Sequence, residues 1–490
     1  MTTLTSQEKP TEELRMFIDG HWVESSGGEV FEAFNPATGR VIATLPKGTR
    51  EDARLAVQAA REAQPKLASM SIWDRSKLLV DIADVMESRK EGLARTLSED
   101  QGKPFWSEAL FEVGKAIEGF RNAAEHVKWL EGETIRVEDP NKRVFTIYQP
   151  RGVYAVVTPW NFPMNIPVEY LAPGLAAGNA IAWVPAPTTS VCAVKLMECL
   201  IEAGLPEGAV NLVTGPGDVV GDEIVGHPDT DAVGFTGSAV TGVHIAHRAA
   251  GKPCLLEMGG NGPVIVLDDA DMDKAIAATS GGSFSNAGQI CSSSERVLVG
   301  AGIYDEFAER VVDAAKQVRL GDPLDKASDM GPLNNPGVAK KVAEHLADSL
   351  ERGASVIYGG KARGDLGSDL FFEPTVLTNV SLDSRLNQEE TFGPVVPLIR
   401  VKSDEEILEI ANRNTFGLVA SVFTRDINRA YYFAEGIKTG TVNINDASTY
   451  WELHVPFGGA SGKLSGVGRV GGKYALREMS DLKTISIDVG

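Results

Sequence analysis

Two periodicities of hydrophobic and polar positions divide this chain and predict its elements. Residues 15–46 alternate over short runs broken by turn residues, which predicts short strands and turns. Residues 51–66 and 73–98 carry apolar side chains at helical spacing and predict two amphipathic helices, and a further helix is expected over 107–131. The part before residue 131 is therefore expected to be helical after a short β segment.

A β–α alternation takes over from residue 152. Strand-like apolar runs are separated by helical patterns, which predicts a parallel, doubly wound sheet with helices on both faces. A second α/β region is expected over 262–440. The strand candidates are VYAVVT, AIAWV, AVNLVTG, DAVGFTG and PCLLEMG in the first region and PVIVLDD, ERVLVG, SVIYGG and LVASVFT in the second.

The segment EGETIRVEDPNKRVFTIYQP predicts a β-hairpin that projects from the main body. Its two halves alternate between apolar and polar residues around an Asp-Pro-Asn-Lys turn. Near the C-terminus, LKTISID is a strand candidate with no hairpin partner nearby. We expect it to pair with the projecting hairpin, within the chain or across a subunit boundary, because an exposed strand edge favours aggregation.

Composition and charge narrow the class of protein. At 490 residues the chain is long enough for two or more domains, and 43% hydrophobic with 23% charged residues is ordinary for a globular protein. No apolar run reaches the roughly 18 to 20 residues of a membrane helix, and the polar start MTTLTSQEKPTEEL has no signal core. The net charge of −20 disfavours nucleic acid and anionic lipid. We therefore expect a cytoplasmic protein that binds neither nucleic acid nor membrane.

The cysteines predict reduced thiols rather than a disulfide or metal framework. None forms a CxxC pair and no zinc-type spacing with histidine occurs, so no metal site is expected. Cys192, Cys199 and Cys254 lie in apolar segments and are expected in the core. Cys291 differs, because it follows a Gly-Gln pair in the stretch SFSNAGQICSSSERVLV, where the backbone can approach a ligand closely.

Three segments carry the parts needed for chemistry on a carbonyl. Cys291 supplies a thiol, Glu257 in CLLEMGGNGPVIV a carboxylate, and Asn161 in VVTPWNFP a side-chain amide. Together such groups can form a covalent adduct, hold its oxyanion and hydrolyse it. Glu257 lies in an apolar stretch, where an unpaired carboxylate is costly and therefore favours a functional or paired role.

These three segments, in this order and with these neighbours, resemble the aldehyde dehydrogenase superfamily over nearly the whole chain. The resemblance implies an α/β fold with a Rossmann-like cofactor domain, an α/β catalytic domain and a small β oligomerisation hairpin. The NAD(P)-binding domain is expected over 1–131 and 149–257, the catalytic domain over 258–440, and the oligomerisation segment over 132–148 and 473–490. The family is typically dimeric or tetrameric, so a homodimer or homotetramer is expected.

The resemblance also implies the reaction, which is oxidation of an aldehyde to a carboxylic acid with NAD(P). The Cys291 thiolate attacks the carbonyl to give a thiohemiacetal, whose oxyanion is held by the Asn161 amide and the Cys291 N–H. Hydride transfer to the nicotinamide leaves a thioester, which water hydrolyses with Glu257 as base. The alternatives are a CoA-acylating enzyme, against which Glu257 argues, and a non-catalytic protein that retains the fold.

Further matching segments imply a cofactor site, although the GxGxxG fingerprint is absent. FTGS ends a strand and opens a helix, where N–H groups and the Ser238 hydroxyl can face a pyrophosphate; taken alone, Ser238 reads as a helix N-cap. In the family, the residue matching Glu390 binds the nicotinamide ribose and that matching Phe392 packs near the ring. The expected contacts are Thr158, Pro159, Trp160, Val184, Gly217, Gly221, Phe235, Thr236, Gly237, Ser238, Glu257, Met258, Gly259, Glu390 and Phe392.

Four positions depart from the family pattern. Val184 stands where a lysine usually reaches the adenosine ribose, and Pro187 where some NAD-preferring members have an acidic residue. NAD is favoured, with NADP possible, because no basic group replaces the lysine. Tyr170 stands where many members have a lysine linked to proton release, so a proton path would use Tyr170 or water. Glu169 stands where members specific for carboxylate-bearing aldehydes often have arginine.

An acidic residue at 169 would repel an acidic semialdehyde, so the expected substrate is an uncharged aliphatic or aromatic aldehyde. The C-terminal motif PFGGASGKLSGVGRVGG is longer than the common family form and lacks the usual glutamate after Arg469. Aromatic residues in the loop before it are expected to line an apolar tunnel. The expected substrate contacts are Phe162, Met164, Glu169, Tyr170, Phe284, Ile290, Ser292, Trp451 and Phe457.

Overall fold

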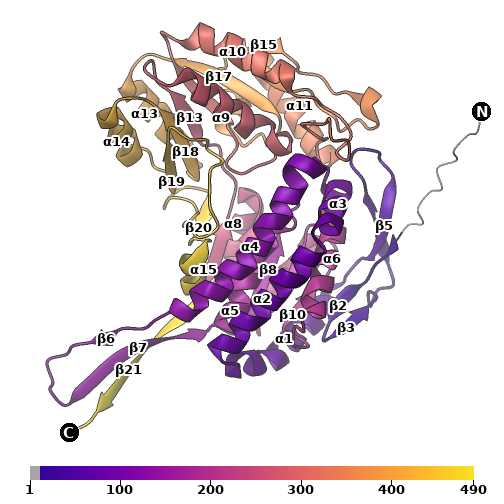
Figure 1. Ribbon diagram of the computed structural model, residues 1–490, viewed down its shortest axis with the longest axis vertical. Helices are drawn as coiled ribbons and strands as arrows, with labels where there is room; N and C mark the ends of the chain where they lie inside the picture. Colours follow the sequence, from indigo (N-terminus) through magenta and orange to yellow (C-terminus); the bar gives the residue numbers. More distant parts are fainter. Residues whose placement is uncertain (1–11) are drawn as a thin grey trace, which may run out of the picture.

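Two sheets, each covered by helices, organise residues 12–490, which are the residues that the computed structural model describes (Figure 1). The polar start of the chain, from which we expected no signal core, lies almost wholly outside these residues. Across residues 12–490, none of the helices combines the length and the apolar character needed to cross a membrane.

The first sheet has eight strands in the order β20-β12-β11-β8-β9-β10-β2-β3. Its five central strands, β12 to β10, are parallel, as the β–α alternation predicts, whereas the strands at both sides pair antiparallel. Parallel strands are covered on both faces and are therefore almost wholly apolar. The strands are β2 (Met16–Ile18), β3 (His21–Val23), β8 (Val153–Thr158), β9 (Ala180–Pro185), β10 (Val210–Leu212), β11 (Ala232–Thr236), β12 (Cys254–Glu257) and β20 (Gly466–Val467).

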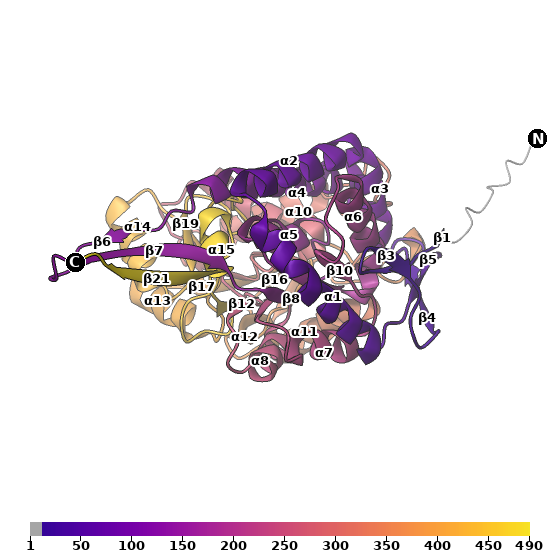
Figure 2. The same cartoon turned by 90° about the horizontal axis from the view of Figure 1, so that it is seen from below.

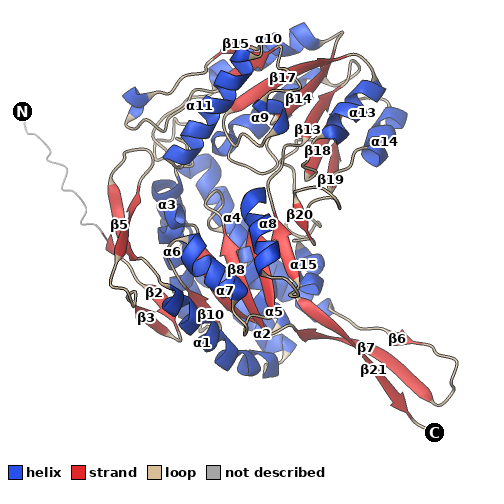
Figure 3. Cartoon of the chain, turned by 180° about the vertical axis from the view of Figure 1, so that it is seen from behind, coloured by secondary structure: helices blue, strands red, loops and turns tan. Residues whose placement is uncertain are grey.

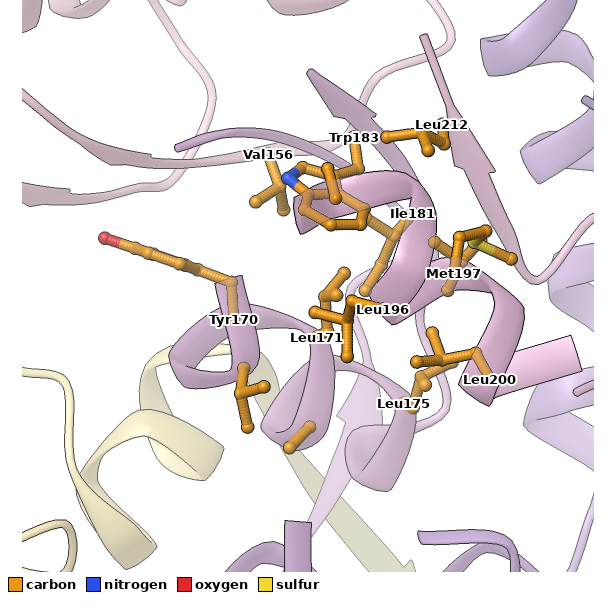
Figure 4. Packing of buried hydrophobic residues seen from close by; sticks show 14 of the residues in the cluster. Val156, Tyr170, Leu171, Leu175, Ile181, Trp183, Leu196, Met197, Leu200 and Leu212 are labelled. Atoms are coloured by element: carbon orange, nitrogen blue, oxygen red, sulfur yellow. The ribbon is translucent and has the colours of Figure 1, made fainter. Parts of the chain in front are cut away.

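The core of this unit lies between the sheet and its covering helices. Figure 4 shows apolar side chains of α5, α6 and strands β8 to β10 packed together. Trp183 on β9 is fully buried, and its indole N–H donates to Thr158 Oγ1 at 2.9 Å. Truncating a leucine in such a core typically costs about 2–5 kcal/mol. The helices are α1 (Arg50–Ser69), α2 (Ile72–Ser88), α3 (Lys90–Gln101), α4 (Leu110–His126), α5 (Asn165–Ala177), α6 (Ser190–Glu202), α7 (Asp222–Gly226), α8 (Ala239–Arg248) and α15 (Gly472–Glu478).

The single helix predicted over 73–98 is in fact two helices. Arg89 separates α2 from α3 and leaves helical geometry, with φ −108° and ψ 7°. Its guanidinium forms ion pairs with Glu198 and Glu202 of α6. This tertiary contact has no trace in the hydrophobic periodicity, which continues through the break.

The second sheet has seven strands in the order β15-β16-β17-β14-β13-β18-β19 and its own apolar core. All strand pairs are parallel except β15 with β16 at one edge. The strands are β13 (Pro263–Val266), β14 (Arg296–Gly300), β15 (Ser355–Tyr358), β16 (Thr375–Thr378), β17 (Val395–Val401), β18 (Val419–Phe423) and β19 (Thr441–Ile444). The helices are α9 (Met272–Phe284), α10 (Tyr304–Gln317), α11 (Pro336–Glu351), α12 (Arg385–Gln388), α13 (Asp404–Arg413) and α14 (Ile427–Gly436).

A three-stranded arm, in the order β21-β7-β6, projects from the first unit (Figure 3). The predicted hairpin is present, although β6 (Thr134–Ile135) is short and β7 (Lys142–Pro150) is long. The C-terminal strand β21 (Ser480–Asp488) pairs along all of β7 within the same chain, from Ser480 opposite Pro150 to Asp488 opposite Lys142. Figure 2 shows the arm on one side of the molecule and a small sheet of β1 (Glu12–Glu13), β5 (Val41–Pro46) and β4 (Val30–Phe34) on the other.

Candidate active site

The carboxyl ends of β8, β11 and β12 bring three predicted segments to one edge of the first sheet. Asn161 follows β8, the FTGS segment spans the end of β11, and Glu257 ends β12. Ligands of open α/β sheets bind at this edge, because the loops after the strands converge there. The loops that carry Cys291 and Glu390 come from the second unit and meet Gly259 and Gly260, which follow β12 after Met258. The candidate site therefore lies between the two sheets.

Asn161 is buried, with 4% of its surface exposed, and is tied to the cysteine loop. Its Nδ2 donates to the Gln289 carbonyl at 3.1 Å, and its own carbonyl accepts from Asn286 Nδ2 at 3.0 Å. A side-chain amide carries two N–H donors. One fixes the orientation of the Asn161 amide, and the second can serve an oxyanion.

The loop before Cys291 has a strained backbone. Asn286 and Ala287 have φ of 49° and 51°, a left-handed conformation that typically costs about 1–3 kcal/mol in residues other than glycine. Gly288 follows with φ 74°, and a Cβ there would come within 2.0 Å of the Gly393 carbonyl. The buried Gln289 side chain donates to the Asn286 carbonyl at 2.8 Å. The turn that presents Cys291 is thus held by buried amides that we did not single out from the sequence.

Cys291 is partly exposed and lies against Gly260. A Cβ on Gly260 would come within 2.1 Å of the Cys291 carbonyl, so only glycine lets the two loops approach. Burial raises the pKa of the Cys291 thiol well above its ordinary value, and the negative charges of Glu390 and Glu257 raise it further. This raised pKa favours the protonated thiol, so the side chain must lose its proton to become the nucleophilic thiolate.

Glu257 is a buried carboxyl group whose two oxygens have no hydrogen-bond partner within residues 12–490. A Cβ on Gly458 would lie 2.7 Å from Glu257 Oε1, so this glycine leaves room for the carboxyl group. Burial raises the pKa of Glu257 well above 4.5, the charge of Glu169 raises it further, and Arg469 opposes the shift. An unpaired buried carboxyl group destabilises the fold, and a strongly shifted pKa in a cleft is typical of a functional group.

Glu390 lies beside the cysteine loop and can accept a ligand hydrogen bond. Its Oε1 accepts from Gly260 N at 2.9 Å, and within the described residues its Oε2 has no hydrogen-bond partner. The ring of Phe392 stands edge-on to Trp160, with centroids 5.5 Å apart. A carboxylate acceptor next to partly exposed aromatic rings fits a ribose and a planar nicotinamide, and it lies where its charge acts on Cys291.

Glu295 fixes the loop that carries Glu390, a role that we missed in the sequence. Its carboxylate accepts from the N–H groups of Thr391, at 2.8 Å, and Phe392. Phe392 has φ 62°, so these bonds hold a strained conformation. Burial and the charge of Glu390 raise the pKa of Glu295 to about 8. An acidic residue directly before a buried strand was the available signal, because a carboxylate is seldom fully buried without a partner.

The FTGS segment joins the end of β11 to the start of α8 and is hydrogen-bonded to the end of β12. Ser238 is the N-cap of α8, where its Oγ accepts from Thr241 N at 3.3 Å, so the N-cap interpretation is confirmed. Ser238 remains exposed, and the first N–H groups of a helix favour an anion. Gly237 N donates to the Glu257 carbonyl at 3.0 Å. The backbone just before α8 is therefore linked directly to that of Glu257.

The other residues predicted to contact the cofactor differ in how far they are exposed to solvent. Around Gly217 an added Cβ would meet nothing within 4 Å, so its backbone borders open space. Val184, Phe235 and Met258 have buried side chains. Thr158 is bonded to Trp183 in the core. Pro159 and Trp160 are partly exposed, Thr236 and Gly237 likewise, and Gly221 and Gly259 are buried backbone positions.

Glu169 lines a narrow cavity of about 30 Å³ between α4, α5, α15 and the loop at Trp451. It is the only ionisable residue among those lining the cavity. Asn165 Nδ2 donates to its Oε1 at 2.8 Å. Burial raises the pKa of Glu169 to about 8. The negative charge of Glu169 in turn raises the pKa of Cys291 and of Glu257.

Among the remaining predicted substrate residues, two aromatic rings lie side by side. The rings of Trp451 and Phe457 lie 5.4 Å apart, and both are partly exposed. Tyr170 is fully buried, and its hydroxyl donates to the Phe235 carbonyl at 2.8 Å, so this group already has a partner on β11. Met164 and Phe284 are buried, Ile290 and Ser292 flank Cys291, and Phe162 is partly exposed.

The chain is similar to known proteins over almost its whole length. Residues 22–485 match the model of the aldehyde dehydrogenase family. The succinate-semialdehyde dehydrogenase [NADP(+)] of Escherichia coli is 38% identical over 96% of this chain and 97% of its own length. The lactaldehyde dehydrogenase of Methanocaldococcus jannaschii is 40% identical over 96% of this chain and 100% of its own.

Solved structures agree with this assignment. Betaine aldehyde dehydrogenase of Staphylococcus aureus in complex with NAD+ superimposes with a TM-score of 0.94 at 36% identity, covering 97% of this chain and 95% of that one. Succinate-semialdehyde dehydrogenase of Burkholderia pseudomallei gives 0.95 at 35% identity, covering 99% and 100%. The chain therefore belongs to the aldehyde dehydrogenase family. It is an NAD(P)-dependent enzyme that oxidises an aldehyde to a carboxylic acid.

Proposed function

We propose that Cys291, Asn161 and Glu257 carry out this oxidation as nucleophile, oxyanion donor and base. Cys291 Sγ, once deprotonated, bonds to the aldehyde carbon and converts the carbonyl oxygen into an oxyanion. The free N–H of the Asn161 amide and the Cys291 backbone N–H stabilise that oxyanion. Losing one such donor typically costs about 3–4 kcal/mol of barrier.

Glu257 is proposed to act in the second half of the reaction. It takes a proton from water as the water oxygen attacks the thioester carbon. The C–S bond then breaks, releasing the carboxylic acid and the Cys291 thiolate. A positioned base of this kind contributes about 100- to 10,000-fold. The unpaired, buried carboxyl group supports this role, because its raised pKa leaves it a stronger base than an exposed glutamate.

The cofactor is proposed to bind across the carboxyl edge of the first sheet. The start of α8 at Ser238 would hold the pyrophosphate, and Glu390 Oε2 would accept from the nicotinamide ribose. The bound nicotinamide supplies a hydride acceptor. We favour NAD over NADP, because no basic group stands in place of a lysine at Val184. Residues 1–131 and 149–257 are accordingly proposed as the cofactor domain and 258–440 as the catalytic domain.

The substrate is proposed to be an uncharged aliphatic or aromatic aldehyde. Glu169, beside Trp451, supports this choice, because its carboxylate would repel an acidic substrate whenever it is ionised. The relatives include enzymes named for an acidic semialdehyde, lactaldehyde and betaine aldehyde, so family membership alone leaves the substrate open.

The enzyme is also proposed to be a homodimer or homotetramer that works in the cytoplasm. The arm supports the first point, since β21 leaves its outer edge unpaired within the described chain and exposes Leu482 and Ile487. Such an edge is a template for pairing with a second copy.

The observation that carries the proposal is the unpartnered carboxyl group of Glu257 beside the loop that presents Cys291. Steady-state reduction of NAD and of NADP should be measured across neutral, acidic and amino aldehydes. Turnover is expected with NAD and neutral aldehydes and without CoA. Turnover only in the presence of CoA would overturn the hydrolytic role of Glu257 and favour a CoA-acylating enzyme. Inactivity toward every aldehyde under both conditions would overturn the catalytic assignment.

A further inference from the structure

A buried ion pair between Lys103 and Glu112 contacts the backbone of Asn161. Their side chains are each 1% exposed, and the Lys103 ammonium contacts the Glu112 carboxylate. Lys103 comes from the loop after α3, and Glu112 lies in the first turn of α4. Neither residue belongs to the site predicted from the sequence.

The Lys103 ammonium has three partners in this environment. The first is the Glu112 carboxylate, and the second is the Asn161 carbonyl at 2.9 Å. The third is the face of the Phe162 ring, whose centroid lies 3.9 Å from Lys103 Nζ. A cation over an aromatic face is attracted to the ring electrons. Lys103 therefore contacts two consecutive residues, Asn161 and Phe162, of the segment that carries the proposed oxyanion donor.

Glu112 binds the backbone at the other end of the same segment, at Met164 and Asn165. Its Oε2 faces Lys103, and its Oε1 accepts from Met164 N at 2.9 Å and Asn165 N at 3.2 Å. These N–H groups open α5 and have no partner within the helix, so the carboxylate acts as its cap. The ion pair thus binds the segment 161–165 at both of its ends.

A buried ion pair of this kind adds little to the net stability of a fold. Taking two charges out of water costs about as much as their attraction returns, so a well-packed apolar pair would often serve the fold equally well. What an apolar pair could not supply is a set of directed bonds to the Asn161 carbonyl and the start of α5. The backbone of Asn161 is consequently fixed while its side-chain amide is aligned by the Gln289 carbonyl.

We infer that Lys103 and Glu112 are positioning residues for the oxyanion donor. They hold the segment 161–165 so that the Asn161 amide meets the oxyanion of the Cys291 adduct. This inference rests on the proposed function, in which Asn161 stabilises that oxyanion. Misplacing a group by about 1 Å can cost on the order of 100-fold in rate, so losing the pair should slow formation of the adduct.

The test is a double-mutant cycle between Lys103 and Asn161 with pre-steady-state kinetics. The rate constant of the first burst of reduced cofactor is measured for Lys103→Met, Asn161→Ala and the double variant, with NAD affinity and melting temperature alongside. Lys115→Met is the matched control, because Lys115 pairs with Glu118 on the same helix at a partly exposed site. If Lys103→Met does not fold, Lys103→Gln combined with Glu112→Gln replaces it, since two neutral amides can still hydrogen bond.

The expected result is a burst roughly 10- to 100-fold slower in Lys103→Met, with NAD affinity unchanged and the Lys115→Met control normal. In the Asn161→Ala background the same substitution should cost almost nothing further, because its effect passes through Asn161. Equal losses in both backgrounds, or weakened NAD binding, would overturn the positioning role. A normal burst in Asn161→Ala alone would instead overturn the proposed oxyanion role itself, and the inference with it.

Discussion

Replacing Glu257 with glutamine should separate the two halves of the reaction. Glutamine has the same shape but cannot take a proton from water. Neither carboxyl oxygen of Glu257 has a hydrogen-bond partner within residues 12–490, so the substitution breaks no bond in the folded protein. The loss should therefore be that of the base alone, about 100- to 10,000-fold, which corresponds to about 3–5 kcal/mol of barrier to thioester hydrolysis.

Stopped-flow measurement of reduced cofactor is the appropriate assay. The variant should give a burst close to one equivalent per active site, followed by a slow steady state. In the unsubstituted enzyme, the hydrolysis rate should rise as the pH increases through the raised pKa of Glu257, because only the ionised carboxylate is a base. In the variant this dependence should be absent. Glu131→Gln, an exposed position, is the control.

Stability gives an independent check on the same substitution. Since the pKa of Glu257 is raised in the folded state, folding favours the protonated group, and stability falls as the pH rises above its ordinary value of 4.5. Glutamine removes this penalty, so the variant should melt at the same or a higher temperature at pH 8. Unchanged turnover without a burst, or a strongly lowered melting temperature, would refute the interpretation of Glu257 as an unpaired base.

Three further predictions concern the nucleophile, the substrate and the arm. Cys291→Ala should abolish aldehyde oxidation while leaving NAD binding measurable by calorimetry, and residual full activity would contradict the nucleophile assignment. Glu169→Gln should raise kcat/KM for an acidic semialdehyde relative to a neutral aldehyde, mainly above pH about 8, where Glu169 is ionised; a pH-independent ratio would contradict charge repulsion. Deleting 480–490 should leave the edge of β7 that faces β21 unpaired and reduce the oligomer seen by light scattering, whereas deleting only 489–490 should not.

Much of the fold could be predicted from the sequence because it is encoded locally. The run VYAVVT is β8 itself, and the other strand candidates match observed strands within a few residues. Runs of apolar residues between helical patterns are typical of parallel strands that are covered on both faces, and these runs can be recognised within a short stretch of sequence. Strands such as β16 and β17 were not identified, although they too are apolar.

The residues that we propose as the reacting groups could also be picked out from the sequence. Cys291, Glu257 and Asn161 occur in distinctive local contexts, and a thiol, carboxyl and amide are recognisable by their chemistry. The family that those contexts indicated is the one to which the chain belongs. Their proximity was not available, because Asn161 meets the cysteine loop through tertiary hydrogen bonds to the Gln289 carbonyl and from the Asn286 side-chain amide.

Only the tertiary structure decided how these groups are supported. Lys103, Glu112 and Glu295 look like surface charges in the sequence, yet each is buried against backbone groups far along the chain. The break at Arg89 and the pairing of β21 with β7 inside one chain depend on similar distant contacts. The sequence by itself determined which local elements form and which chemical groups are present, because short-range periodicity and side-chain type set both. The surroundings of those groups, and hence their pKa values and orientation, depend on packing between segments that lie far apart in the sequence.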